Sequence, residues 1–308
     1  MPIDKIFLSV GAMKAGTTFL YNVFREHPDL HFTPEKELHY FAHIYGLDRK
    51  LQVSSPSSLK SWLSRNVPKK RLILSQEFRR HRLSMVMHNK YSKIEDPDKL
   101  RHIVNWYADR YLKSPVDQDW FESVFHEAGD RYACDFSNYH ALLPSSGWRD
   151  IKKNVKKIRV IYILREPVSR LWSHIKFHLI QTGNHESLKN LSEHTIDKIL
   201  RETSSIAAHG KYGNIIKHLK KNLDQDQLRI IPFEDLINNF EKTVKDIEGF
   251  LEISPFDYKH VNIKKKSNPS VDIQLTEELK TKLKNIVNPE LDQLKNLNIN
   301  VPSSYFFN

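Results

Sequence analysis

The sequence predicts an α/β fold in which a central parallel sheet is flanked by helices. Four short apolar segments look like buried parallel strands, at residues 5–10, 131–136, 160–164 and 228–232. Helical patterns lie between or after them, and alternating strands and helices are typical of a parallel sheet that is covered on both faces. A chain of 308 residues, 39% of them hydrophobic, is long enough to bury a full core of this kind.

The first predicted strand leads directly into a turn and a helix. The turn, residues 11–18, reads Gly-Ala-Met-Lys-Ala-Gly-Thr-Thr, and the helix-like stretch covers residues 17–26. Backbone N–H groups at such a turn, added to the positive end of the helix dipole, form an anion-binding site. The alternative is a structural turn that binds nothing. The residues that we expect to hold a phosphate here are Lys14, Ala15, Gly16, Thr17 and Thr18.

The position of the lysine in this turn separates two kinds of nucleotide chemistry. The spacing of the glycines matches the P-loop of nucleotide triphosphatases, yet Thr17 stands where that loop carries its lysine. The lysine is at Lys14 instead, which argues against an ordinary ATP or GTP hydrolase and implies a different leaving group. A P-loop nucleotide kinase or nucleotidase, which needs Mg²⁺ and that lysine, is the first alternative.

Residues 43–128 read as a helical insertion into a single domain that spans residues 1–308. Helices are expected around residues 59–65, 99–112 and 119–128, separated by Ser-Pro and Asp-Pro pairs. Because long excursions from a compact core are often functional, two roles fit this segment: shaping an acceptor site, or capping the core.

A second candidate anion site follows the strand at residues 160–164. Residues 165–174 read Arg-Glu-Pro-Val-Ser-Arg-Leu-Trp-Ser-His, with the proline in the first turn of a predicted helix, where its missing N–H costs nothing. Arg165 offers a planar fork that suits a phosphate. The alternative is a helix start with surface arginines. Farther on, apolar side chains recur at helical spacing over residues 211–223, and this helix is expected to pack on the sheet.

These two motifs resemble those of the sulfotransferases that use 3′-phosphoadenosine 5′-phosphosulfate (PAPS). In that family the 5′-phosphosulfate loop has the form Gly-x-x-Lys-x-Gly-Thr-Thr, and the 3′-phosphate motif pairs an arginine with a later serine. The resemblance implies a P-loop-like sulfotransferase fold and transfer of a sulfuryl group from PAPS to an acceptor hydroxyl or amine. It assigns Arg165 and Ser173 to the 3′-phosphate, and Lys14 to the bridging oxygen of the departing 3′-phosphoadenosine 5′-phosphate (PAP). No metal is expected.

A third segment carries the candidate base. Residues 34–41, Pro-Glu-Lys-Glu-Leu-His-Tyr-Phe, resemble the Lys-Glu-x-His-Phe-Phe pattern of sulfotransferases related to the heparan sulfate enzymes. The match makes Glu37 the candidate base, with a pKa that we expect to be raised by partial burial. His39 is the competing candidate, because histidine is the usual base of the cytosolic sulfotransferases. Without the resemblance, Glu37 reads as a solvated glutamate in a charged loop.

Two later segments bear on the nucleotide and the acceptor. Residues 262–269 resemble the loop that closes over the nucleotide in relatives, where Lys264, Lys265 and Lys266 either neutralise phosphates or solvate a turn. Residues 135–139 depart from the family pattern Glu-Lys-(Ser/Thr)-Pro-x-Tyr. Phe136 replaces a lysine that contacts acidic sugars in the glycan enzymes, which puts a heparan-like acceptor in doubt.

The histidines at positions 174 and 178 lie one turn apart on the predicted helix. No third ligand for a metal is apparent, so we expect a helix-surface or core role for both.

Charge and cysteine content restrict the partners and the compartment. The formal net charge of +11 favours anionic partners, but charge alone does not choose among nucleotides, acidic glycans, nucleic acid or a membrane surface. A nonenzymatic basic protein is the second alternative, although no recognised nucleic-acid module supports it. The single cysteine, Cys134, fits a reducing cytosol, and no apolar run approaches membrane-spanning length. We expect a cytoplasmic enzyme acting on a small-molecule or glycan acceptor, without a nucleic acid or membrane partner.

Overall fold

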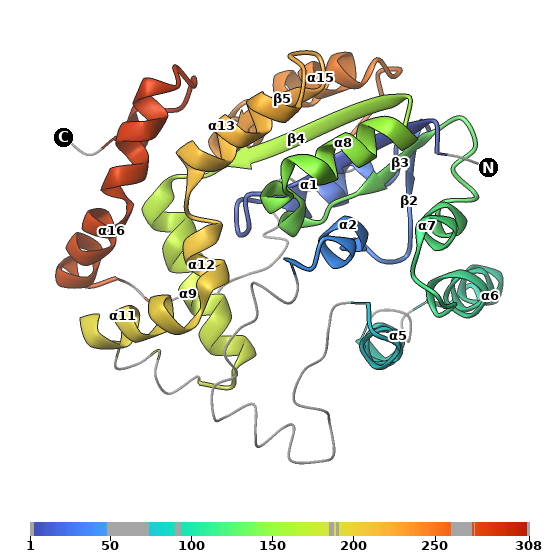
Figure 1. Ribbon diagram of the computed structural model, residues 1–308, viewed down its shortest axis with the longest axis horizontal. Coiled ribbons are helices and arrows are strands. Elements are labelled where there is room, and N and C mark those ends of the chain that lie inside the picture. Colours follow the sequence, from blue (N-terminus) through green and yellow to red (C-terminus); the bar gives the residue numbers. More distant parts are fainter. Residues whose placement is uncertain are drawn as a thin grey trace.

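A five-stranded parallel sheet forms the centre of the protein (Figure 1). Its strands follow the spatial order β2-β3-β1-β4-β5, and every neighbouring pair is parallel. The strands are β1 Lys5–Ser9, β2 Leu30–Phe32, β3 Tyr132–Asp135, β4 Lys157–Leu164 and β5 Leu228–Pro232. The computed structural model describes residues 3–47, 74–89, 94–184, 188, 191–259, 273 and 275–306.

The strands confirm the predicted parallel sheet and add one element to it. Four strands match the predicted apolar segments, and β4 is buried along its length after Lys157, as expected for a strand covered on both faces. No segment of the sequence predicted β2. It holds three residues, of which Leu30 alone is buried, and it pairs with β3 at the edge of the sheet. Three residues are too few for a strand pattern to stand out from a loop.

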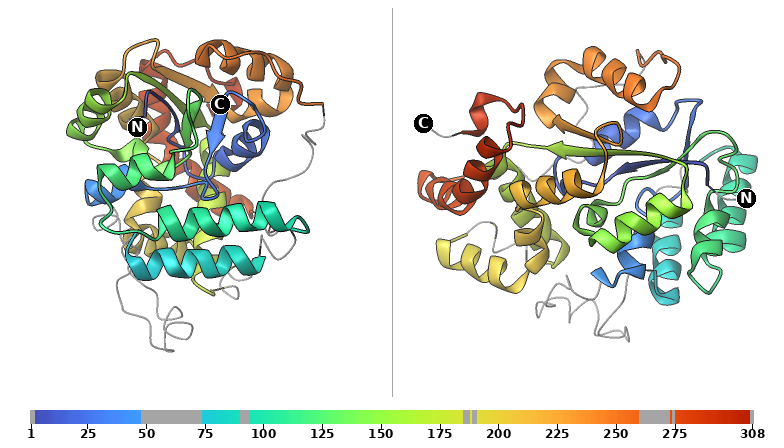
Figure 2. Two further views of the ribbon diagram at one scale, coloured as in Figure 1. Left: turned by 90° about the vertical axis from the view of Figure 1, so that its right-hand side faces the viewer. Right: turned by 45° about the horizontal axis from the view of Figure 1, so that its top comes forward.

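Helices cover both faces of the sheet, as the α/β prediction requires. Figure 2 shows α1 and α15 on one face and α8 and α13 on the other. The rings of Phe19 in α1 and Phe240 in α15 meet edge to face with their centres 6.2 Å apart. These helices are α1 Thr17–Phe24, α8 Ser145–Asn154, α13 Tyr212–Asn222 and α15 Phe240–Leu251.

The remaining helices gather at the two ends of the sheet (Figure 1). Beyond the carboxyl end of β4 lie α9 Pro167–Gln181, α11 Glu193–Glu202, α12 Ser204–Ala208 and α16 Glu277–Asn296. Toward the opposite end lie α5 Gln76–Asn89, α6 Pro97–Trp106 and α7 Gln118–Val124. Shorter elements are α2 Tyr40–Ile44, α14 Phe233–Asn238, the π-helix η2 Tyr107–Tyr111 and the 3₁₀ helices η3 Asn138–Leu142 and η4 Ser303–Tyr305.

The described part of the segment read as an insertion is helical. The helix expected at residues 99–112 is α6 continued by η2, and the helix expected at residues 119–128 corresponds to α7. Asp96 caps α6, because its carboxylate accepts hydrogen bonds from the amides of Asp98 and Lys99 ahead of the first turn. The helix expected at residues 59–65 lies outside the described residues. The division into a single domain with an insertion stays a prediction.

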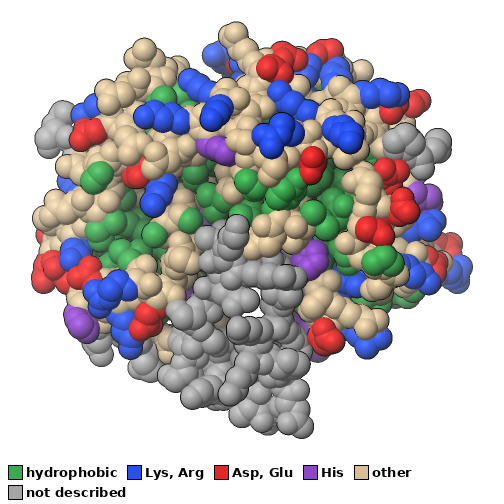
Figure 3. Space-filling model, viewed as in Figure 1, with side chains coloured by type: hydrophobic (Ala, Val, Ile, Leu, Met, Phe, Trp, Pro, Cys, Tyr) green, Lys and Arg blue, Asp and Glu red, His purple; other side chains and the backbone are tan. Residues whose placement is uncertain are grey.

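Basic side chains gather over α8 and α13, along the upper half of the face seen in Figure 3. Lys217, Lys220 and Lys221 are exposed on α13. Within the ranges given above, no helix is both long and apolar enough to cross a membrane.

Candidate active site

The turn after β1 lies against the carboxyl end of β4. The amide of Ala12 donates to the carbonyl of Ile163 (2.7 Å), and the amide of Ile163 donates to the carbonyl of Gly11 (2.7 Å). The turn then rises through Lys14 at φ 70° and Gly16 at φ 94° into α1. The predicted order of strand, turn and helix is therefore confirmed, and the turn is fixed to the neighbouring strand at its base.

The amino terminus of α1 has the features of an anion site. Its N-cap residue, Gly16, provides no side-chain cap, and its first turn holds no acidic residue. The first amides of a helix have no partner within the helix, so these groups are available to a ligand. Thr17 is buried and Thr18 is half-buried at this end of the helix, while Ala15 is fully buried beneath it.

Gly16 meets two requirements that no other residue satisfies at this position. Its φ of 94° lies in the left-handed region that favours glycine, and a Cβ atom added to it would overlap the ring of Phe233. Phe233 is the first residue of α14. The close approach of the Gly16 backbone to this ring therefore fixes the shape of the turn after β1.

Lys14 lies within a group of positive charges. Its Nζ atom stands 4.0 Å from the centre of the Phe177 ring on α9. Burial, followed by the neighbouring charges of Arg165 and Lys36, lowers the pKa of Lys14 below its ordinary value, while Glu37 acts in the opposite direction. An incoming anion would relieve this repulsion, which favours binding of a negatively charged group beside Lys14.

Arg165 joins the two predicted phosphate motifs. It follows β4 directly, and its Nη1 atom donates a 3.1 Å hydrogen bond to the carbonyl of Lys14. The Tyr212 hydroxyl, at the start of α13, donates to the Arg165 carbonyl (3.1 Å) and accepts from its amide (3.4 Å). Two segments about 150 residues apart in the sequence thus meet side by side at one edge of the sheet.

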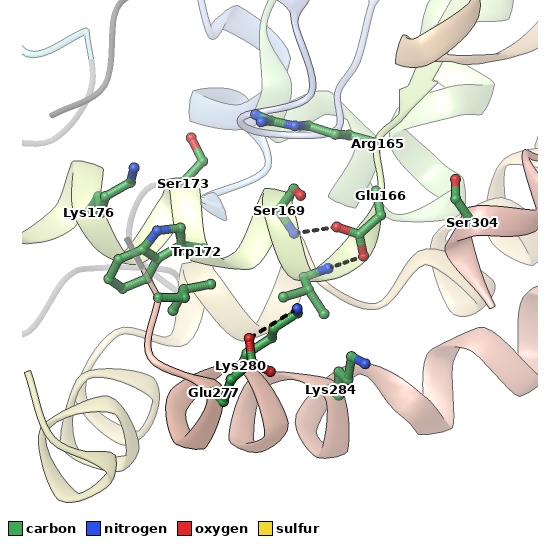
Figure 4. A pocket seen from close by; sticks show the side chains of 12 residues that line it. Arg165, Glu166, Ser169, Trp172, Ser173, Lys176, Glu277, Lys280, Lys284 and Ser304 are labelled. Carbon is green, nitrogen blue, oxygen red and sulfur yellow. Dashed lines mark hydrogen bonds and ion pairs between the residues drawn. The ribbon is translucent and has the colours of Figure 1, made fainter. Parts of the chain in front are cut away.

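Ser173 and Arg165 line the same cleft, which has a volume of about 560 Å³. Figure 4 shows the α9 side of this cleft, with Glu166 turned back toward its own helix. The carboxylate of Glu166 accepts from the amides of Val168 (2.9 Å) and Ser169 (2.8 Å). Because the amino terminus of α9 is already capped, an anion in this cleft has to be held by side chains.

Glu37 is surrounded by three polar partners. Its Oε1 atom lies 2.5 Å from Nζ of Lys36 and 3.3 Å from Nδ2 of Asn138, and its Oε2 atom lies 3.2 Å from Nε2 of His39. Burial pushes the pKa of Glu37 up, but Lys36 and His39 outweigh that effect and hold it well below its usual range. The expectation of a raised pKa was wrong, because the sequence does not show that Lys36 and His39 both face the carboxylate.

The rings of His39 and Tyr139 meet edge to face. The ring centres are 5.4 Å apart, and the His39 backbone, at φ 57°, donates its amide to Oγ of Ser137 (2.8 Å). Its Nε2 atom faces Glu37, while its Nδ1 atom is buried and has no hydrogen-bond partner among the described residues. When Nε2 donates to Glu37, Nδ1 is the nitrogen that is left to accept a proton, and it is shielded from solvent.

The segment after β3 positions the candidate bases. Asp135 accepts hydrogen bonds from the amide of Leu38 (3.1 Å) and from the hydroxyl of Ser137 (2.5 Å), and burial raises its pKa to about 6. Phe136 points into the core, where its ring meets those of Phe7 and Phe32. At this departure from the family pattern, the side chain at position 136 therefore lies in the core and not in the site. Sequence reasoning missed one signal for these contacts, which is the group of polar residues at and just after the end of β3.

Sequence reasoning also missed Lys36. Its Nζ atom lies between the candidate base and the turn after β1, 2.5 Å from Oε1 of Glu37 and 3.5 Å from Oγ1 of Thr17. The neighbouring Glu35 is buried and accepts from the Tyr107 hydroxyl (2.8 Å) and from Arg82 (2.7 Å). Helices α5 and η2 are thereby attached to the segment that carries the candidate base.

The other predicted residues contribute less to this site. His174 and His178 are buried on α9, and Nδ1 of His174 lies 3.2 Å from Nη1 of Arg170. Across the residues that the structure describes, no three side chains of the metal-binding types converge. Lys264, Lys265 and Lys266 lie outside the described residues.

The fold is that of an α/β protein in which the turn after β1 and the start of α9 meet at the carboxyl ends of the strands. The profile described as "Sulfotransferase family" matches residues 6–258. The chain belongs to the sulfotransferase family, which assigns it the transfer of sulfuryl groups as its chemistry.

Two solved structures are similar to this chain at low sequence identity. A sulfotransferase from Alicyclobacillus acidocaldarius is similar with a TM-score of 0.54 and 20% identity, over 98% of each chain. The sulfotransferase domain of the Synechococcus PCC 7002 olefin synthase gives a TM-score of 0.49 and 15% identity, over 97% of this chain and 95% of that one. No curated protein matches the chain in sequence.

Proposed function

We propose that the chain transfers a sulfuryl group from PAPS to a hydroxyl or amine of an acceptor by a single in-line displacement. The observation that carries this proposal is the contact between Arg165 and the carbonyl of Lys14. It brings the open amino terminus of α1 next to a cleft that contains Ser173. One nucleotide with phosphates at both ends of its ribose fits such a pair of sites.

Two sets of residues bind the two phosphate-bearing ends of the donor. The amides at the start of α1, with Thr17 and Thr18, hold the 5′-phosphate side, and Arg165 with Ser173 holds the 3′-phosphate. Lys14 stabilises the negative charge that develops on the bridging oxygen as the bond from sulfur to that oxygen breaks. Positioning and charge stabilisation by these side chains support the reaction.

Glu37 is the base that the geometry supports best. Its carboxylate is one-third exposed and stays ionised at neutral pH, because Lys36 and His39 hold its pKa well below the usual range. The acceptor proton moves to this carboxylate as the acceptor oxygen or nitrogen forms its bond to sulfur. His39 then serves to orient the carboxylate, since its own Nδ1 atom is buried.

Transfer of ³⁵S from labelled PAPS to a panel of sugar, lipid and small-molecule acceptors tests this function. We expect product with the wild-type protein, and a loss of turnover by at least about a hundredfold in Lys14→Ala, because a charge stabiliser of the transition state is removed. The Lys14→Ala protein should keep the wild-type circular dichroism spectrum. Equal binding of PAP and AMP, together with magnesium-dependent ATP hydrolysis, would instead identify a P-loop kinase or nucleotidase.

A further inference from the structure

Two lysines of α16 face the cleft that contains Arg165 and Ser173. Lys280 and Lys284 line this cleft, and both are half-buried. Residues four apart lie on one face of a helix, so these two side chains form a single basic edge. Figure 4 shows them on the helix that runs opposite α9. The volume of about 560 Å³ lies within the range of clefts that hold small ligands.

The charge of this cleft is positive. Its lining includes four cations and two carboxylates. One carboxylate, Glu166, is engaged by the amides of α9, and the other, Glu277, is 86% exposed and forms an ion pair with Lys280 across 3.4 Å. Four cations against two carboxylates leave the cleft with an excess of two positive charges. The four cations are Arg165, Lys176, Lys280 and Lys284.

The cleft has walls from two helices that pack against each other. On α9, Ser169, Ser173 and Lys176 recur at helical spacing and line the cleft. The amino terminus of α9 offers no free amides there, because Glu166 caps it. An anion held in the cleft therefore meets side chains from α9 on one wall and from α16 on the other.

We propose that Lys280 and Lys284 complete the binding site for the 3′-phosphate of the sulfuryl donor. This inference rests on the proposed function and adds α16 to the donor site. A phosphate monoester carries close to two negative charges at neutral pH, and enclosure by cations on both walls favours it over a ribose hydroxyl. The lysine pair thus selects nucleotides that carry a phosphate on the ribose.

Calorimetric titration with PAP and with AMP tests the assignment, since the two ligands differ in the 3′-phosphate alone. In Lys280→Gln/Lys284→Gln we expect the Kd for PAP to rise by about 10- to 100-fold and the Kd for AMP to stay within about twofold. The dependence of the PAP affinity on salt should also become shallower, because two cations have been removed.

Lys282→Gln is the matched control on the same helix. Its Nζ atom pairs with Asp197 (3.0 Å) and Glu193 (3.7 Å) and does not line the cleft. The control should bind PAP as the wild type does. Lys280→Arg/Lys284→Arg keeps both charges and should retain the preference for PAP, which separates loss of charge from loss of folding.

The outcomes distinguish this inference from the function on which it rests. If the wild type binds PAP no better than AMP, the donor assignment fails and the α16 site fails with it. If the wild type prefers PAP and the double glutamine variant keeps that preference, the donor assignment stands and the role of α16 is overturned. A preference lost in the glutamine variant and kept in the arginine variant supports the site.

Discussion

The guanidinium of Arg165 donates a 3.1 Å hydrogen bond to the backbone carbonyl of Lys14. This bond ties the side chain assigned to the 3′-phosphate to the backbone of the turn assigned to the 5′-phosphate. The same guanidinium lies 5.5 Å from the centre of the Phe233 ring, which in turn contacts Gly16. One side chain therefore contacts both the backbone of the turn after β1 and the ring of Phe233.

Arg165→Lys should weaken the donor site although it keeps the charge. A lysine offers a single ammonium group, which cannot bond the Lys14 carbonyl and a phosphate with the fixed fork of a guanidinium. We expect the Kd for PAP to rise by about 10- to 100-fold in calorimetry. Arg149→Lys, an exposed position on α8, is the control and should bind PAP normally. Unchanged PAP affinity in Arg165→Lys would show that the fork plays no part in binding.

Lys36→Met should move the acid limb of the pH profile of kcat/KM upward. In the wild type, Lys36 and His39 keep Glu37 ionised as the pH falls through the ordinary range of a glutamate, near 4.3. Without Lys36, burial remains as the largest influence on Glu37, and it raises the pKa. The carboxylate would then take up a proton at higher pH and lose its capacity to act as a base.

Lys36→Arg is the matched variant for that experiment, because it restores a cation beside Glu37. Its acid limb should return to the wild-type position. An acid limb that is the same in Lys36→Met and in the wild type would show that Glu37 is not the group whose ionisation limits the reaction.

The sequence predicted the sheet and the turn from β1 into α1 because both depend on local patterns. Buried parallel strands read as apolar runs, and the turn after β1 carries its glycines and lysine in one short segment. Contacts between segments that are far apart in the sequence could not be predicted from such local patterns. Neither the meeting of Lys36 with Thr17 nor the overlap that makes Gly16 necessary is visible without the fold.

The wrong expectation for the pKa of Glu37 also comes from contacts that the sequence does not show. Burial alone would raise its pKa, as expected from the sequence, but the direction is decided by which charged groups face the carboxylate. The lysines of α16 were missed for a related reason. They lie more than 100 residues after Arg165, on a helix whose side facing the cleft is set by packing against α9.

Gly16→Ala should destabilise the protein, while Gly249→Ala should stabilise it. At Gly16 the added methyl group overlaps the Phe233 ring and the backbone has φ 94°, a strain of about 1–3 kcal/mol. At Gly249, in the exposed part of α15, an added Cβ meets nothing within 4 Å, and alanine favours the helix by about 0.5–1 kcal/mol. Urea denaturation of both variants measures the two shifts.

Gly16→Ala/Phe233→Ala separates the two causes at Gly16. Removing the ring relieves the overlap and leaves the backbone strain in place, so the double variant should be more stable than the sum of the two single changes predicts. Strict additivity of the two free-energy changes would show that the ring and the glycine do not interact.

Arg79→Met should destabilise the helices near the amino-terminal ends of the strands. The side chain of Arg79 is 1% exposed and donates to the carbonyls of Leu74 (3.0 Å), Tyr111 (2.5 Å) and Lys113 (2.6 Å). Methionine fills similar space but leaves the carbonyls of Leu74 and Lys113 without this donor, while the Tyr111 carbonyl keeps the indole N–H of Trp120 (3.2 Å). Because each buried acceptor left unpaired costs about 1–3 kcal/mol, we expect a loss of about 2 kcal/mol or more in the free energy of unfolding.

Arg80→Met is the control for that change, because Arg80 is the next residue of α5 and is exposed. It removes the same charge and should shift the free energy of unfolding by no more than about 0.5 kcal/mol. Since Arg79 joins α5 to the end of η2 and to Lys113, its loss should also speed amide hydrogen exchange in α5 and η2 before it affects β1 and β4. Equal destabilisation by the two substitutions would mean that the charge of α5, and not the buried hydrogen bonds of Arg79, holds these helices in place.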